Sequence, residues 1–324
     1  MGAFTNLTGG DVAALAHAFG AGEVERWWPI PAGTINSNFG LKTARGRYFL
    51  RVNEGKGEAE VRYEADLVGE LSRAGLPVLA PIPAQGGEPF ARRGGKLVSL
   101  FPFRDGEHRA RGEVGEHDAR AVGAALADLH AAGLPIAARF DRRGIYTFGD
   151  IVRRLEGIAA PDGDAELARA LKVLGAEAAW LEAREAVRTE ATRGVIHGDL
   201  FRDNVLFRGS ELVLLLDFEQ ASTGSLAYDL AVCINAWCWG DDLERPLSRA
   251  LVAGYRARRE LPPPDRDALY VELRAAAMRF AVTRITDVYL PGIENPDKDY
   301  RRYVRRLERW QALGPDEVAS FLAL

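Results

Sequence analysis

The sequence has few of the features typical of secreted, metal-structured or membrane-spanning proteins. Its 324 residues include only two cysteines, Cys233 and Cys238, which are too few for a disulfide scaffold and do not form a CxxC pair. We expect both to be small buried side chains and not zinc ligands. No apolar run is long enough to span a bilayer, and the N-terminus lacks the basic and then apolar regions of a secretory signal. These absences predict a cytoplasmic protein without a membrane partner.

The charge and glycine patterns exclude two further classes of site. The formal net charge of −4 provides no electrostatic basis for binding nucleic acid. Neither a G-x-G-x-x-G segment nor a Walker-type phosphate loop is present. If the chain binds a phosphate group, it must therefore do so with a different kind of loop.

The first hundred residues alternate strand-like and turn-like segments. "TINSNFGLKT" and "GRYFLRVNE", joined through Gly46, predict an antiparallel hairpin. Residues 58–75 have helical spacing of apolar residues and a glycine stop, and "KLVSLFPF" predicts a further strand.

From about residue 115 the pattern becomes helical, including one long charged helix expected over residues 163–187. We therefore predict an α+β fold of two lobes. Residues 1–103 would form a small antiparallel-sheet lobe, and residues 104–324 would form a larger, mostly helical lobe.

One short segment, "GVIHGDLFRDNVLF", carries the residues most suggestive of chemistry. It holds Asp199 and, five residues later, Asn204, and a further acid, Asp217, follows the apolar run "LVLLL". Phosphoryl transfer needs a carboxylate that orients the attacking hydroxyl, and it needs hard oxygen ligands for Mg²⁺. Asp199 suits the first role, and Asn204 and Asp217 suit the second. We expect Asp217 to be buried, with magnesium as its compensating cation.

Each of these residues also has an ordinary structural explanation when taken alone. Asp217 could belong to a turn or a helix cap, Asn204 could be a solvated loop residue, and His197 could be structural. Their order and spacing within one strand–loop–strand segment favour the catalytic interpretation.

The segment resembles the catalytic loop of the aminoglycoside and choline kinase-like phosphotransferases, which share a protein-kinase-like fold. The resemblance extends over nearly the whole chain and includes "LLLDFEQA", "LADLHAAG" and "AYDLA". It implies ATP and Mg²⁺ as cofactors, Asp199 as the base, and Asn204 and Asp217 as metal ligands. It also implies that His197 and Asp229 support the loop. Protein kinases fit less well, because the loop reads "HGD", the metal segment reads "DFE", and no "APE" follows.

In the first lobe, the resemblance implies that the hairpin segment "GTINSNF" covers the phosphate groups. Gly33, Asn36, Ser37 and Asn38 could donate hydrogen bonds there.

The family usually has a lysine on the strand after this cover, whereas "YFLRV" offers Arg51. A guanidinium group can bind a phosphate or a carboxylate through two hydrogen bonds. Its acidic partner would be Glu64, with Glu60 as the alternative, unless Arg51 is only a solvated strand residue.

Within the superfamily, "LAYDLAVCINAWCW" and "RFAVTRITDVYL" resemble segments of the bacterial homoserine kinases. This implies phosphorylation of the L-homoserine hydroxyl, a step of threonine biosynthesis. A zwitterionic acceptor needs a cation and an anion in its site, and helical spacing puts Arg284 and Asp287 on one face. Asn235, Trp237 and Asp203 are further candidates for substrate contact. Arg284 and Asp287 could instead form a structural ion pair, Trp237 could lie in the core, and Asp203 could cap a helix or turn.

Two other functions remain open from the sequence. A kinase of the same fold could act on choline, ethanolamine, an aminoglycoside or another amino alcohol, but purely cationic acceptors favour sites rich in acids and aromatics. The chain could also be a non-catalytic nucleotide-binding module, although the presence of a base and two metal ligands disfavours this.

Overall fold

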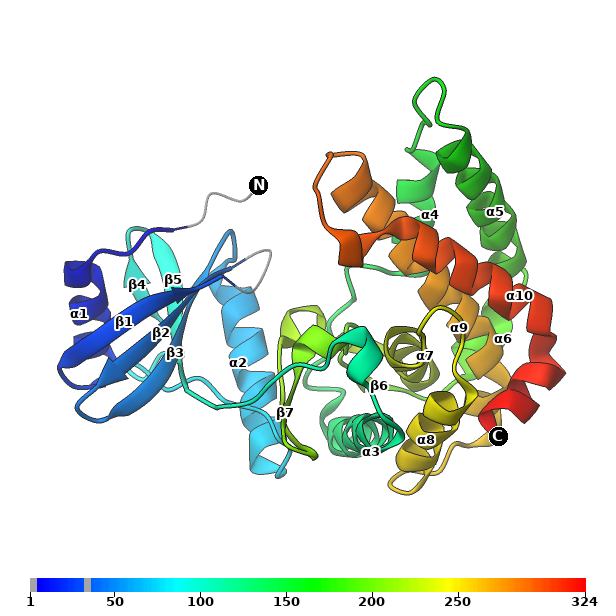
Figure 1. Ribbon diagram of the computed structural model, residues 1–324. Helices are drawn as coiled ribbons and strands as arrows, with labels where there is room; N and C mark the ends of the chain where they lie inside the picture. The colour runs from blue at the N-terminus through cyan, green and yellow to red at the C-terminus, as the bar shows by residue number, and fades with distance from the viewer. Residues whose placement is uncertain (1–4, 32–35) are drawn as a thin grey trace. The chain divides into compact units, whose positions relative to one another are not determined.

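An antiparallel sheet of five strands organises the first part of the chain, as seen in a computed structural model that describes residues 5–31 and 36–324 (Figure 1). The strands follow the order β1-β2-β3-β5-β4. Their bounds are β1 (Val24–Ile30), β2 (Ser37–Thr43), β3 (Gly46–Asn53), β4 (Ala91–Arg93) and β5 (Lys96–Pro102). The predicted hairpin is confirmed as β2–β3, and Gly46 at its turn has a φ of 152°, a conformation that L side chains rarely adopt.

Two helices accompany this sheet. The predicted helix is confirmed as α2 (Glu58–Arg73), whereas α1 (Gly9–Ala18) and strand β1 were not expected from the sequence. A capping box between Thr8 and Asp11 starts α1, and its Leu15 joins a buried cluster with apolar residues of the strands. The sheet and these helices form one unit, residues 1–106, and the division falls near the border expected at Phe103.

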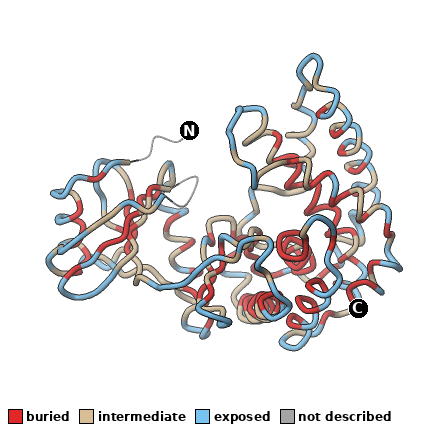
Figure 2. The backbone as a smooth tube through the Cα atoms, viewed as in Figure 1, coloured by how far each residue is buried: buried red, intermediate tan, exposed pale blue. Residues whose placement is uncertain are grey.

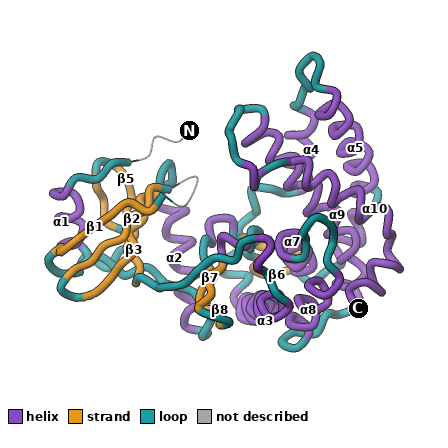
Figure 3. The backbone as a smooth tube through the Cα atoms, in the orientation of Figure 1, coloured by secondary structure: helices purple, strands orange, loops and turns teal. Residues whose placement is uncertain are grey.

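The second unit, residues 107–324, is mostly helical (Figure 3). Its helices are α3 (Glu116–Gly133), α4 (Phe148–Glu156), α5 (Ala165–Glu182), α6 (Glu185–Glu190), α7 (Leu226–Trp237), α8 (Arg245–Arg256), α9 (Pro263–Arg284) and α10 (Tyr300–Leu322). The single helix expected over residues 163–187 is wrong, because α5 ends before Arg184. The Arg184 guanidinium lies 3.9 Å from the centre of the Trp180 ring, and it donates to the Trp180 carbonyl at 3.2 Å.

Helices α7 and α9 are buried along most of their length (Figure 2). Short antiparallel pairs lie before α7: β6 (Arg193–Ile196) with β9 (Ser222–Ser225), and β7 (Val205–Arg208) with β8 (Glu211–Leu215). The predicted strand–loop–strand segment therefore lies between β6 and β8, and the buried face of α7 supports it. Among the described residues, no helix combines the length and the apolar composition that crossing a bilayer requires.

Close packing of α3 against α8 depends on a pair of glycines, and this gives a testable prediction. A Cβ atom on Gly123 would lie 2.0 Å from the Leu251 carbonyl oxygen, and one on Gly254 would lie 2.1 Å from that of Arg120. We expect Gly123→Ala to lower the free energy of unfolding by about 1–3 kcal/mol through overpacking, measured by urea denaturation.

Gly175 provides the matched control, since it is an exposed helical glycine of α5 whose added Cβ would meet no atom within 4 Å. Gly175→Ala should raise the free energy of unfolding by about 0.5–1 kcal/mol through helix propensity. Similar gains in both variants would contradict the tight α3–α8 contact.

Candidate active site

Asp199 lies in the loop that follows β6, and residues far away in sequence hold its carboxylate. Arg279 of α9 approaches Asp199 Oδ1 with Nη1 at 3.4 Å, and the Gln220 side chain donates to Oδ2 at 3.2 Å. Arg279 also donates to the Gly198 carbonyl at 3.0 Å and to the Gln220 side-chain oxygen. The carboxylate orientation is therefore fixed by a buried guanidinium group and an amide.

The surroundings of Asp199 change its acidity. Its side chain keeps 25% of its surface exposed, while Arg279 keeps 4%. Burial raises the pKa of the Asp199 carboxyl group, and the positive charge of Arg279 opposes part of that increase. A carboxylate with a raised pKa is a stronger proton acceptor, so long as it remains ionised at working pH.

The fully buried carboxylate of Asp229 binds the backbone of the loop that carries Asp199. It accepts hydrogen bonds from the backbone amides of His197 at 2.7 Å and Gly198 at 2.8 Å, and it contacts His130 Nε2 at 3.0 Å. Burial alone would raise the pKa of Asp229, but these hydrogen bonds hold it below its ordinary value. The carboxylate is therefore ionised and fixes the two residues that precede Asp199.

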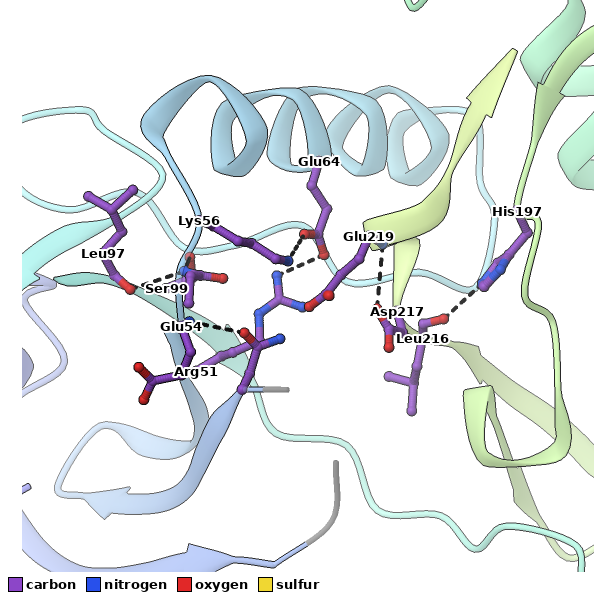
Figure 4. Close-up of polar contacts among 12 residues, drawn as sticks. Arg51, Glu54, Lys56, Glu64, Leu97, Ser99, His197, Leu216, Asp217 and Glu219 are labelled. Carbon is purple, nitrogen blue, oxygen red and sulfur yellow. Dashed lines mark hydrogen bonds and ion pairs between the residues drawn. The ribbon is translucent and has the colours of Figure 1, made fainter. Parts of the chain in front are cut away.

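His197 connects the loop to the strand that ends at Leu216. Its Nδ1 accepts from the Asp199 amide at 3.3 Å, and its Nε2 lies 2.8 Å from the Leu216 carbonyl oxygen (Figure 4). These partners assign a neutral imidazole with the proton on Nε2. Leu216 in turn donates its backbone N–H to the Asn204 carbonyl at 2.9 Å. The backbone next to Asp217 is thus bound to both sides of the loop.

Asn204 and Asp217 present oxygen atoms in different ways. The Asn204 side-chain nitrogen donates to the Asp199 carbonyl at 2.8 Å, which leaves its amide oxygen facing away from that bond. Asp217 is exposed, so the expectation that it would be buried is wrong. The chain leaves β8 at Leu215, Asp217 adopts a left-handed conformation with φ of 62°, and the apolar Phe218 is buried in its place. Such strain in a residue other than glycine is typical of functional sites.

The side-chain oxygens of Asn204 and Asp217 suit a Mg²⁺ ion that also binds phosphate and water, and not a metal ion whose ligands all come from the protein. Among residues 5–31 and 36–324, no group of three or more His, Cys, Asp or Glu side chains could hold a metal ion. Mg²⁺ commonly binds one or two protein oxygens and completes its shell with phosphate and water oxygens. The amide oxygen of Asn204 and the carboxylate of Asp217 suit that mode of binding.

The first unit contains a second charged cluster, around Glu64. Arg51 of β3 donates to Glu64 Oε1 at 2.7 Å, and Lys56 approaches Oε2 at 3.3 Å (Figure 4). Burial disfavours the charged form of Glu64, but both cations hold its pKa below the ordinary value. The alternative partner, Glu60, instead accepts from the Gly57 amide at 2.9 Å and caps α2. Arg51 is therefore not a solvated strand residue.

Two residues of the predicted phosphate cover, Asn36 and Ser37, bind the half-buried Glu54. Glu54 accepts from the Ser37 hydroxyl at 2.7 Å, and its backbone amide donates to the Asn36 side chain at 3.2 Å. Asn38 is part of β2, opposite Arg51 in the sheet register. Gly33 lies outside the described residues.

Two of the predicted substrate residues lie in the core of the second unit. Asn235 is fully buried, donates to the carbonyls of Ala231 and Leu273, and accepts from the Trp310 indole. Trp237 is 1% exposed and donates to the Leu200 carbonyl at 2.9 Å. Both positions belong to α7, which is buried along nearly its whole surface, so their polar groups bind neighbouring groups of the core.

The remaining substrate candidates lie nearer the surface. Asp287 pairs with Arg154 at 3.0 Å and not with Arg284, so the structural ion pair considered as the alternative to substrate contact does not form. Arg284 instead stacks on the ring of Tyr303, with its guanidinium carbon 4.0 Å from the ring centre. Asp203 is exposed in the short helical turn after Asp199.

The sequence analysis missed Arg279, Gln220 and Lys56. Arg279 carried a usable signal, since an arginine inside the apolar segment "MRFAV" is buried only if it is paired. Nothing in the sequence distinguishes Gln220 or Lys56 from surface residues, because their partners come from distant segments.

Comparison with known proteins finds similarity to phosphotransferases. A family model described as "Phosphotransferase enzyme family" matches residues 27–270. The homoserine kinase of Methylorubrum populi is 36% identical over 317 residues, covering 95% of both chains. The homoserine kinase of Afipia carboxidovorans is 33% identical, covering 97% of this chain and 95% of the relative.

Solved structures share the fold at lower identity. An aminoglycoside phosphotransferase from Alicyclobacillus acidocaldarius has a TM-score of 0.67 at 16% identity and covers 93% of each chain. A microcompartment-associated aminopropanol kinase has a TM-score of 0.64 at 20% identity, covering 96% of this chain and 99% of the other. These likenesses confirm the expected fold class.

The role of Asp229 yields a prediction for the loop. Asp229→Asn replaces one accepting oxygen by an NH₂ group, which would face a backbone N–H or the His130 N–H. We expect the free energy of unfolding to fall by about 2–4 kcal/mol, measured by urea denaturation.

Asp287→Asn is the control, because its pair with Arg154 is exposed and should contribute at most about 0.5 kcal/mol. Equal losses in the two variants would show that Asp229 does not brace the loop.

Proposed function

The chain belongs to the phosphotransferase enzyme family, and from this membership we propose that it transfers the γ-phosphoryl group of ATP to the hydroxyl group of L-homoserine. It is a kinase that acts on a small molecule. The product would be O-phosphohomoserine, an intermediate of threonine biosynthesis. Similarity to homoserine kinases over 95% of the chain supports the choice of acceptor.

Asp199 is the proposed catalytic residue. Its carboxylate would orient the acceptor hydroxyl and accept its proton while the new O–P bond forms and the bond to the leaving ADP breaks. The hydrogen bonds from Gln220 and the approach of Arg279 support this role, since they fix the carboxylate before substrate arrives.

Asn204 and Asp217 would hold Mg²⁺ through an amide oxygen and a carboxylate oxygen. The ion would neutralise negative charge on the nucleotide phosphates. His197 and Asp229 would act as supports, because their contacts run to the backbone of the loop.

In the first unit, Arg51 would bind a nucleotide phosphate with Glu64 orienting its guanidinium group. The 2.7 Å bond between them supports this assignment, and Arg51 replaces the lysine that is usual in the family. Backbone and side-chain donors of Asn36, Ser37 and Asn38 would cover the phosphates. This unit, residues 1–103 in the sequence prediction, would thus serve nucleotide binding, and residues 104–324 would serve catalysis.

The observation that carries the proposal is the Asp199 loop. Its carboxylate has a raised pKa and is held by Gln220 and Arg279, and a backbone bond from Leu216 to Asn204 connects this loop to the residue before Asp217. A non-catalytic nucleotide-binding module would have no need of that carboxylate.

A panel of acceptors tests the proposal. With MgATP, we expect kcat/KM for L-homoserine to exceed that for choline, ethanolamine or an aminoglycoside by at least about 100-fold, measured by ADP release. The reason is that a site built for a zwitterion leaves a charge unpaired when the carboxylate is missing. Comparable values for choline or ethanolamine would reject homoserine as the acceptor and leave only the broader kinase assignment.

The catalytic loop can be tested by matched carboxamide variants. Asp199→Asn should lower kcat by about 100-fold or more, with little change in KM for ATP, because proton acceptance and hydroxyl orientation are both lost.

Asp217→Asn should instead raise the Mg²⁺ concentration needed for half-maximal activity, a change that Asp199→Asn should not produce. Normal turnover in Asp199→Asn would exclude Asp199 as the base.

A further inference from the structure

Two arginines meet at the C-terminal end of α7. Arg202, three residues after Asp199, donates to the Ala236 carbonyl at 3.4 Å, and Arg306 of α10 donates to the neighbouring carbonyl of Asn235. Carbonyls at the end of a helix attract cations. One N–H group of each arginine is therefore bound to a helix carbonyl, and the other N–H groups could bind a ligand.

A third arginine lies beside them with no such explanation. Within residues 5–31 and 36–324, Arg284 has no hydrogen bond and no carboxylate within ion-pair distance, although it is half-buried. Its guanidinium carbon lies 4.0 Å from the centre of the Tyr303 ring, and that of Arg306 lies 4.4 Å from the same ring. Tyr303 therefore carries two guanidinium groups against its ring.

The hydroxyl group of Tyr303 is also without a partner in the described chain. The residue is 1% exposed, and its oxygen makes no hydrogen bond. Burying a hydroxyl without a partner costs free energy. A buried donor without a partner among the described residues, on a ring that two guanidinium groups contact, is typical of an anion-binding site.

The local charge balance is strongly positive. Burial, together with the like charges of Arg284, Arg202 and Arg111, lowers the pKa of Arg306 to about 10. Nearby acids are Asp203, which is exposed, and Asp297, whose side chain is 85% exposed and pairs with Arg302. An anionic group would relieve this repulsion, whereas a cationic acceptor such as choline would increase it.

We propose that Arg202, Arg284, Arg306 and Tyr303 form the binding site for the carboxylate of an amino-acid acceptor. The inference rests on the proposed function, and it adds the residues that recognise the acid. Of these four residues, only Arg284 is predicted from the sequence to contact the acceptor, with Asp287 as the acidic group of the same site.

The position of the arginine cluster in the second unit is consistent with an acceptor as short as homoserine. The Phe201 backbone amide donates to the Asp199 carbonyl at 2.8 Å, and the Phe201 ring lies 5.9 Å from the Arg284 guanidinium carbon. In an extended homoserine molecule, the hydroxyl oxygen and the carboxylate carbon are about 5 Å apart. We expect a molecule of this length, with its carboxylate held by the cluster, to reach the loop that carries Asp199.

Tyrosine-to-phenylalanine variants give the sharpest test. Tyr303→Phe removes a hydroxyl that has no partner among residues 5–31 and 36–324, so the fold should be unharmed and its Tm unchanged or raised. We expect the ratio of kcat/KM for L-homoserine to that for 3-aminopropan-1-ol, which is homoserine without its carboxylate, to fall about tenfold or more. Arg284→Gln should lower the ratio in the same direction.

Tyr300→Phe is the matched control. Tyr300 lies one turn earlier on α10 and is equally buried with an unpartnered hydroxyl, but its ring contacts Tyr289 and Arg301 instead of the cluster. Its ratio should equal that of the unchanged protein. A thermal shift induced by L-homoserine alone should weaken in Tyr303→Phe and persist in Tyr300→Phe.

The outcomes separate this inference from the proposed function. If the unchanged protein prefers homoserine but Tyr303→Phe and Arg284→Gln leave the ratio as it was, the carboxylate site is wrong and the kinase assignment stands. If KM for ATP rises while the acceptor ratio stays constant, the cluster binds a nucleotide phosphate and the inference is again overturned. If the unchanged protein shows no preference for homoserine, the proposed acceptor fails together with its carboxylate site.

Discussion

The ionised carboxylate of Asp229, buried in the helical unit, is the interaction on which the arrangement of the loop depends. Removing such a charge from water costs several kcal/mol unless donors surround it. Two backbone amides and His130 do so. Because those amides belong to His197 and Gly198, the same bonds that stabilise the charge also set the direction in which the chain leaves for Asp199. His197 then carries the constraint to Leu216 and the start of the metal-binding segment.

The charged side chains of the second unit fall into two kinds, those that are paired within the fold and those that have no partner of opposite charge among the described residues. Arg274 is paired with Glu177 and Arg188 with Glu272, and these buried pairs belong to the scaffold. Arg284 instead stacks on an aromatic ring without a carboxylate partner among the described residues. A group of this second kind gains most from a ligand, since binding supplies the opposite charge that the described residues do not provide.

Much of the fold and the central part of the candidate site could be predicted from the sequence. Periodicity gave the β2–β3 hairpin, α2 and the helical character of the second unit, and local spacing singled out Asp199, Asn204 and Asp217. Errors arose where tertiary contacts decide. The burial of Asp217 was wrong because one left-handed residue turns the chain outward, and Asn235 and Trp237 lie in the core because α7 is buried along nearly its whole surface. Arg279 was missed because its partners are about 60 to 80 residues away in sequence.

A crystal structure with L-homoserine, Mg²⁺ and a non-hydrolysable ATP analogue tests the central claim most directly. The account predicts that the acceptor hydroxyl lies about 2.6–3.2 Å from the Asp199 carboxylate. It also predicts that oxygens of Asn204 and Asp217 lie about 2.0–2.1 Å from the metal. An acceptor bound elsewhere, with its hydroxyl far from Asp199, would contradict it.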